Sequence, residues 1–234
     1  MSHRRKRQSS RSSTPDRAPN SAASFVPSRP TLRSAKVAAA GCQGCDLWRR
    51  ATQTVFGAGP AKADVMFVGE QPGHEEDLAG RPFIGPAGRV LNRALEAAGI
   101  PLGEVYLTNV VKHFKWEPRG KRRIHARPRA SEIAACRPWL ETELALVRPR
   151  ALVCLGATAA RALLGAGFSV TAERGVFIES PLASLVMATV HPASILRAPT
   201  HEARDLAMAQ LIKDLKALAA RLAGVRKATP GRAR

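Results

Sequence analysis

The feature that most constrains the fold of this chain is a regular alternation, from Cys42 onward, of short apolar runs with amphipathic stretches of helical period. Such an alternation is typical of βαβ units, whose parallel strands form a sheet covered by helices on both faces. The runs predicted as strands are residues 64–69, 105–111, 151–155 and 184–190, and the predicted helices are residues 86–98, 131–146, 158–164 and 201–222. The sequence therefore predicts an α/β fold that binds ligands outside the carboxyl ends of its strands.

Lys and Arg are concentrated in three segments of a chain whose formal net charge is +19. Residues 1–38 hold nine bases against one acid, residues 221–234 hold five against none, and residues 112–129 hold eight against Glu117. Each phosphate that meets such a cation releases condensed counterions, so a basic segment attracts a polyanion. A solvated basic face is the alternative for a single run, but two basic tails beside it favour nucleic acid.

The domain organisation follows from composition. The Ser-, Arg- and Pro-rich residues 1–38 are expected to be a disordered basic tail, since their low apolar content cannot offset the entropy of ordering. Residues 39–220 are expected to form one domain and residues 221–234 a basic C-terminal tail. No apolar run approaches the roughly 18 residues of a membrane span, and the N-terminus lacks the apolar segment of a secretory signal. We therefore expect a cytoplasmic monomer that does not bind membranes.

Several motifs stand directly after the predicted strands. Residues 69–73 read Gly-Glu-Gln-Pro-Gly, residues 80–88 read Gly-Arg-Pro-Phe-Ile-Gly-Pro-Ala-Gly, and glycine at such turns lets a ligand approach the backbone. The later motifs are Thr108-Asn109, Cys136-Arg137-Pro138-Trp139, Leu-Gly-Ala-Thr-Ala-Ala at residues 155–160, and His191-Pro192. In this order the set resembles the family 4 and UdgX branches of the uracil-DNA glycosylase superfamily, over about residues 41–215. The resemblance implies a three-layer α/β/α sandwich with a central four-stranded parallel sheet.

The chain has four cysteines: Cys42, Cys45, Cys136 and Cys154. Without an export signal they are not expected to form disulfides, and the Cys-x-x-Cys pair is typical of a metal or redox site. Cys154, in a predicted buried strand, would alone be an ordinary small hydrophobe. The family resemblance implies that all four hold a [4Fe–4S] cluster, with four-cysteine zinc as the alternative.

The resemblance also implies roles in uracil excision, which requires the target nucleotide to leave the base stack. Phe83 would stack on the flipped base and Asn109 would read its edge, with Gln71 and Asp77 also in the uracil-binding set. His191 would stabilise the departing uracil and Glu70 the sugar cation. Uracil-containing DNA, preferably single-stranded, would be the partner. The simpler alternatives are a core aromatic for Phe83 and a turn former for Asn109.

Two features resemble the UdgX branch in particular. One is Gln71 in the first motif, and the other is Lys121-Arg122-Arg123-Ile124-His125 inside the basic segment. In that branch the histidine attacks the sugar C1′ after uracil leaves, which implies a covalent adduct through His125, while Lys121, Arg122 and Arg123 would contact DNA phosphates. The alternatives are a multiple-turnover family 4 enzyme, a phosphate-binding His125, and a noncatalytic iron-sulfur DNA-binding protein.

This chain departs from its relatives at two positions. His74 follows Gly73 where an acidic residue is common, and Ala193 follows His191-Pro192 where serine is usual. A polar contact at position 74 is therefore in doubt, and a hydroxyl expected to touch phosphate is either lost or moved to Ser194.

Overall fold

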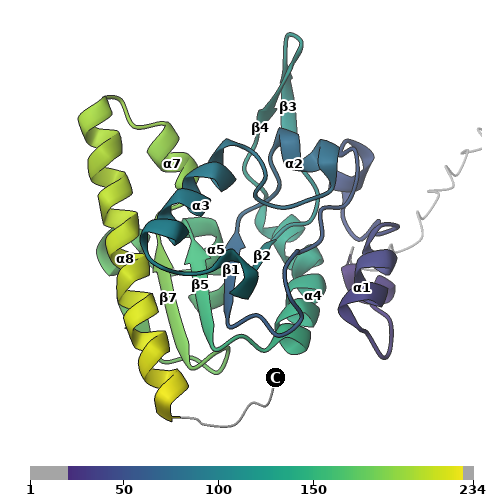
Figure 1. The fold of residues 1–234 in the computed structure, drawn as a ribbon. Helices are drawn as coiled ribbons and strands as arrows, with labels where there is room; N and C mark the ends of the chain where they lie inside the picture. Colours follow the sequence, from purple (N-terminus) through teal and green to yellow (C-terminus); the bar gives the residue numbers. More distant parts are fainter. Residues whose placement is uncertain (1–20, 229–234) are drawn as a thin grey trace, which may run out of the picture.

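The computed structural model describes residues 21–228, and its centre is a sheet in the order β2-β1-β5-β7-β6 (Figure 1). The four predicted strands are confirmed as β1 (Val65–Gly69), β2 (Val105–Asn109), β5 (Ala151–Leu155) and β7 (Leu185–Thr189), all parallel to their neighbours in this set. The sheet has a fifth strand, β6 (Phe177–Ile178), which pairs antiparallel with β7. Two half-buried residues give no readable period, so the sequence did not predict this edge strand.

Helices cover both faces of the sheet, as the α/β prediction required. One face packs against α3 (Pro86–Ala97), α7 (Pro192–Leu196) and α8 (His201–Ala228), and the other against α4 (Ala130–Val147) and α5 (Ala157–Leu164). The alternation within β1 shows why: Val65 and Phe67 enter the first core, and Met66 and Val68 enter the second. The short helices are α2 (His74–Ala79), α6 (Val170–Glu173), η2 (Asp46–Arg49) and η3 (Leu102–Glu104). No helix within residues 21–228 is long and apolar enough to cross a membrane.

The expectation of disorder over residues 1–38 is wrong for the part that the structure describes. Residues 21–38 contribute η1 (Ala22–Phe25) and most of α1 (Leu32–Ala39), which lie beside α4 (Figure 1). Ala22, Ala35 and Ala39 are buried in one cluster with Trp139 of α4. Alanine gives a weak apolar signal in sequence but permits close helix packing, which composition cannot reveal. Residues 1–20 and 229–234 lie outside the described part of the chain.

The basic segment, in which no helix or strand was predicted, contains a β-hairpin. Strands β3 (Trp116–Arg119) and β4 (Arg122–His125) pair antiparallel, and the hairpin projects from the body of the molecule (Figure 1). Its two-residue turn contains Gly120 at φ 58, a left-handed conformation that favours glycine. His125, at the end of β4, pairs with Trp116 at the start of β3, so it lies where the hairpin meets the body.

Candidate active site

The carboxyl ends of β1 and β2 bring Phe83 and Asn109 together over Gly69. Gly69 and Asn109 are register partners, and a Cβ placed on Gly69 would lie 2.4 Å from Asn109 Oδ1 and 2.7 Å from Phe83 Cζ. Within residues 21–228 the Asn109 side-chain amide makes no hydrogen bond, although Asn109 is only 3% exposed. Its amide lies at the carboxyl ends of the strands beside the Phe83 ring, so this position suits recognition of a polar base edge.

The backbone around Phe83 explains the glycines of its motif. Phe83 has φ 55, an uncommon conformation for a residue with a side chain, and a Cβ on Gly88 would lie 1.8 Å from the Phe83 carbonyl oxygen. Gly88 is thus required where α3 begins. The Phe83 ring is tilted by 31° to the His191 ring at a centroid distance of 6.3 Å. Phe83 also packs in the core, as the simpler alternative expected, whereas its stacking on a flipped base stays a prediction.

His191 is held as a neutral hydrogen-bond donor. Its Nδ1 accepts the Ala193 N–H at 3.1 Å at the start of α7, which assigns the ring proton to Nε2. Burial lowers the pKa of His191 to about 4, and the Arg197 and His125 charges act in the same direction. A neutral imidazole with a free Nε2–H can stabilise negative charge that develops on a leaving group. Ala193 contributes its backbone here, while the Ser194 hydroxyl donates to the His191 carbonyl at 2.7 Å.

Glu70 lies between Thr158 and His125. Its Oε2 accepts a hydrogen bond from the Thr158 hydroxyl, and its Oε1 lies 3.5 Å from His125 Nε2. Burial lowers the pKa of His125, an effect that Glu70 opposes and Arg197 reinforces. His125 is therefore predominantly neutral near pH 7. Thr158 belongs to the Leu-Gly-Ala-Thr-Ala-Ala motif but had no predicted role, because its contact with Glu70 joins residues 88 positions apart.

Gln71 was expected in the uracil pocket, but its amide is bonded to the flanks of the hairpin. Its Nε2 donates to the carbonyls of Lys115 at 3.0 Å and Ala126 at 3.1 Å, and its Oε1 accepts the Lys115 N–H at 3.1 Å. Lys115 precedes β3 and Ala126 follows β4. The Gln71 side chain thus joins both strands of the hairpin to the end of β1.

Asp77 and Arg123, expected to bind uracil and phosphate respectively, bind each other. Arg123 Nη1 lies 2.7 Å from Asp77 Oδ2, and the Asp77 side chain is fully buried and also accepts the Thr52 N–H. Arg123 Nε donates to His74 Nδ1 at 3.0 Å, which gives the unusual histidine a partner. Together with Gln71, Arg123 therefore attaches the hairpin to the segment after β1, whereas Lys121 and Arg122 are exposed.

The cysteines do not form the four-thiolate site that was expected. Cys42, Cys45 and Cys136 belong to one buried cluster, whereas Cys154, on β5, faces the core under α4 and α5. No group of three or more His, Cys, Asp or Glu residues within 21–228 is arranged to hold a metal ion. Trp139 is buried in the same cluster as the first three cysteines, and its indole N–H has no acceptor within the described residues. Four cysteines therefore do not fit one cluster, because the strand carries Cys154 into a different core.

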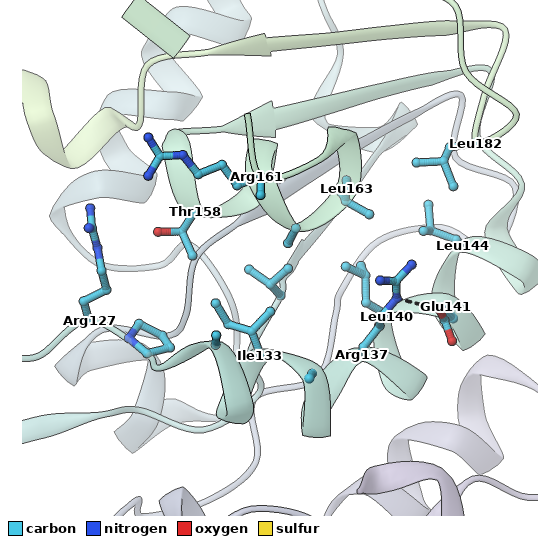
Figure 2. Close-up of a pocket in the computed structure, with 16 residues that line it drawn as sticks. Arg127, Ile133, Arg137, Leu140, Glu141, Leu144, Thr158, Arg161, Leu163 and Leu182 are labelled. Carbon is cyan, nitrogen blue, oxygen red and sulfur yellow. Dashed lines mark hydrogen bonds and ion pairs between the residues drawn. The ribbon is translucent and has the colours of Figure 1, made fainter. Parts of the chain in front are cut away.

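A groove of about 440 Å³ lies between α4 and α5, and its lining includes Thr158, the hydrogen-bond partner of Glu70. Figure 2 shows Thr158 at one end with Arg127 and Arg161 near it, and the apolar side chains of Ile133, Leu140, Leu144, Leu163 and Leu182 along the rest. Glu70 is thus linked through the Thr158 hydroxyl to the groove wall.

Comparison with known proteins places these residues in a family. Residues 56–216 match the model of the uracil DNA glycosylase superfamily. The chain is 36% identical to the type-4 uracil-DNA glycosylase of Sulfurisphaera tokodaii over 177 residues, covering 72% of this chain and 77% of the relative. It is also 36% identical to the type-4 uracil-DNA glycosylase of Pyrobaculum aerophilum over 178 residues, covering 71% and 87% respectively. The chain therefore belongs to the uracil DNA glycosylase superfamily.

Proposed function

We propose that this protein excises uracil from DNA and then captures the sugar covalently through His125. The family match and the type-4 relatives support the uracil-DNA glycosylase activity. The observation that carries the covalent step is the position of His125, whose Nε2 lies 3.5 Å from the Glu70 carboxylate. A nucleophile and a charge-stabilising carboxylate in one place can both act on a sugar cation.

Excision breaks the bond between C1′ of the sugar and N1 of uracil, and the electron pair leaves with the base. Asn109 supplies an amide donor and acceptor for the uracil edge, and Phe83 supplies the face of the pocket. His191 Nε2–H stabilises the negative charge that develops on the departing uracil. Glu70 stabilises the positive charge left on the sugar, as a carboxylate does for other oxocarbenium-like states.

Capture forms a bond between His125 Nε2 and C1′. The 3.5 Å separation from Glu70 is longer than a charge-assisted hydrogen bond, so it does not require a proton on Nε2. The Nε2 lone pair then makes the new bond, and the resulting imidazolium loses its Nδ1 proton to solvent. Because the product is a stable N-glycosidic linkage, each protein molecule reacts once.

Denaturing electrophoresis tests this function directly. After incubation with a labelled uracil-containing single strand, the wild-type protein should give a heat- and detergent-resistant band of increased mass. The matched strand with thymine should give none, because the proposed pocket of Phe83 and Asn109 must accept the base before cleavage and is expected to exclude the 5-methyl group. Free uracil should appear in a yield equal to that of the band. A resistant band with thymine DNA, or uracil release without any band, would contradict covalent capture.

The second candidate is a multiple-turnover glycosylase, in which water and not His125 captures the sugar. The type-4 names of the relatives favour it. It predicts uracil in excess over protein and no resistant band, so the same electrophoresis separates the two functions.

We also propose that the hairpin holds DNA through Lys121 and Arg122, which are exposed at its turn. Changing both to glutamine should flatten the log-log dependence of DNA affinity on salt by about 0.7 to 0.9 per lost phosphate contact. Arg123→Gln should instead lower the yield of the resistant band, because Arg123 anchors the hairpin through Asp77. An unchanged slope in the double variant would assign the electrostatics to other cations.

We further propose an iron-sulfur cluster held by Cys42, Cys45 and Cys136, whose thiols would have to move closer together on binding, because no group of three such ligands within residues 21–228 is arranged to hold a metal ion. Their shared buried cluster and the unpaired Trp139 N–H support it, since a buried donor requires an acceptor. When bound, such a cluster would brace η1, α1 and α4. Cys154→Ala should keep the broad absorbance near about 400 nm that iron-sulfur proteins show, whereas Cys136→Ala should lose it. Loss of the absorbance in Cys154→Ala would restore Cys154 as a ligand.

A further inference from the structure

Beneath Asn109 lies a completely buried ion pair that the excision chemistry does not use. Lys112 Nζ is 2.5 Å from Glu143 Oε2, and both side chains are 0% exposed. Burying two charges costs several kcal/mol each, and apolar residues of similar volume often stabilise a core as well. Packing alone therefore does not explain this pair, and its hydrogen bonds indicate another use.

Every polar atom of the pair has a partner. The Lys112 ammonium donates to Glu143, to the Thr108 hydroxyl at 2.7 Å and to the Asn109 carbonyl at 2.7 Å. The Glu143 carboxylate also accepts from the Gly57 N–H, the Tyr106 hydroxyl and the Thr108 hydroxyl. The network therefore binds both residues of the Thr108-Asn109 motif, the first through its hydroxyl and the second through its carbonyl.

The contact with Asn109 lies close to the side chain that faces the pocket. Lys112 binds the Asn109 carbonyl, and the N–H of the same peptide, on Val110, donates to the Gly69 carbonyl at 2.9 Å. Lys112 and β1 thus fix the peptide next to the Asn109 side chain, whose Oδ1 lies over Gly69 beside the Phe83 ring. The backbone N–H of Lys112 also donates to Cys136 Sγ at 3.2 Å, so Lys112 contacts both the cysteine cluster and the Asn109 carbonyl.

We infer that Lys112, held by Glu143, is a positioning residue for base recognition, which fixes the Asn109 peptide so that its amide meets the edge of uracil. The inference rests on the proposed function, in which Asn109 reads the base. It predicts that loss of the pair weakens uracil recognition even in a folded protein.

The test removes both charges together, because removing one would strand the other in the core. Lys112→Met/Glu143→Gln is compared with Arg150→Met/Asp64→Asn, an ion pair of 3.5 Å at the amino ends of β5 and β1, away from the pocket. Uracil release is measured in single turnover over a range of protein concentrations, and thermal unfolding is measured in parallel. We expect about a tenfold to hundredfold lower rate per bound complex in the first variant only, since a misplacement near 1 Å has effects of this size.

Two further variants complete the experiment. Thr108→Val removes one hydroxyl from the network but leaves the charges paired. Its rate of uracil release should fall by a smaller factor than that of the double variant. It also keeps the positioning role testable if the double variant does not fold. Asn109→Ala should abolish excision, and adding it to Lys112→Met/Glu143→Gln should cause no more loss than Asn109→Ala alone. If Asn109→Ala excises uracil normally, the proposed role of Asn109 fails. If Asn109→Ala is inactive while the network variants act like wild type, only the positioning role of Lys112 fails.

Discussion

Replacing His125 with serine should abolish the resistant protein-DNA band and convert a single-use protein into an enzyme that releases uracil repeatedly. The serine hydroxyl is shorter and less nucleophilic than neutral imidazole, so water reaches the same sugar cation and leaves an abasic site. Excision itself should persist, because Glu70, Asn109 and His191 are unchanged. The measurement is the ratio of free uracil to protein over time, together with denaturing electrophoresis of the same samples.

The matched control for this variant is Arg122→Ser, which changes an exposed residue on the same strand of the hairpin. It should weaken DNA affinity but keep the resistant band at saturating protein. A band that persists in His125→Ser would assign the capture to another nucleophile. A His125→Ser protein that binds DNA weakly and releases no uracil would give the histidine a binding role.

Replacing Glu70 with glutamine should slow uracil release by about 10²–10³-fold, the usual effect of removing one group that stabilises transition-state charge. The amide keeps the size of the side chain and can still accept from Thr158, so the fold should be unchanged. Both free uracil and the resistant band should fall together, because capture requires prior cleavage. Single-turnover rates with excess protein give the comparison.

Thr158→Val is the companion variant, since it removes only the hydroxyl that orients Glu70. Its rate should lie between those of the wild type and Glu70→Gln. A Glu70→Gln protein that cleaves normally but forms no band would limit the carboxylate to the capture step.

The features that the sequence predicted correctly are those determined by neighbouring residues. The four parallel strands were readable because each is a five-residue, mostly apolar run in which only Leu107 of β2 is not buried, and the long helices were readable from their apolar period. Glu70, Asn109 and His191 lie together because parallel strands end at one edge of the sheet, but their roles came from the family resemblance and stay predictions. The two-residue β6 and the alanine-rich α1 carry too little local signal for such a prediction.

What the sequence did not predict depends on contacts between distant segments. The Gln71 amide bonds to residues 44 and 55 positions away, and Arg123 pairs with Asp77 across 46 positions. The motif match predicted that these side chains bind uracil or DNA, whereas in the folded chain they form hydrogen bonds and an ion pair with other parts of the protein. Cys154 shows the same limit, because a cysteine count gives no information on which face of a strand each thiol occupies.

The anchoring of the hairpin has a consequence for engineering. Gln71, His74 and Asp77 all belong to the segment after β1, and all three contact the hairpin or the residues beside it. A glycosylase that received residues 116–125 but had other side chains at the positions of Gln71, His74 and Asp77 would lack these partners, and the grafted histidine would not be held near its carboxylate. Transplanting covalent capture therefore requires moving both segments together.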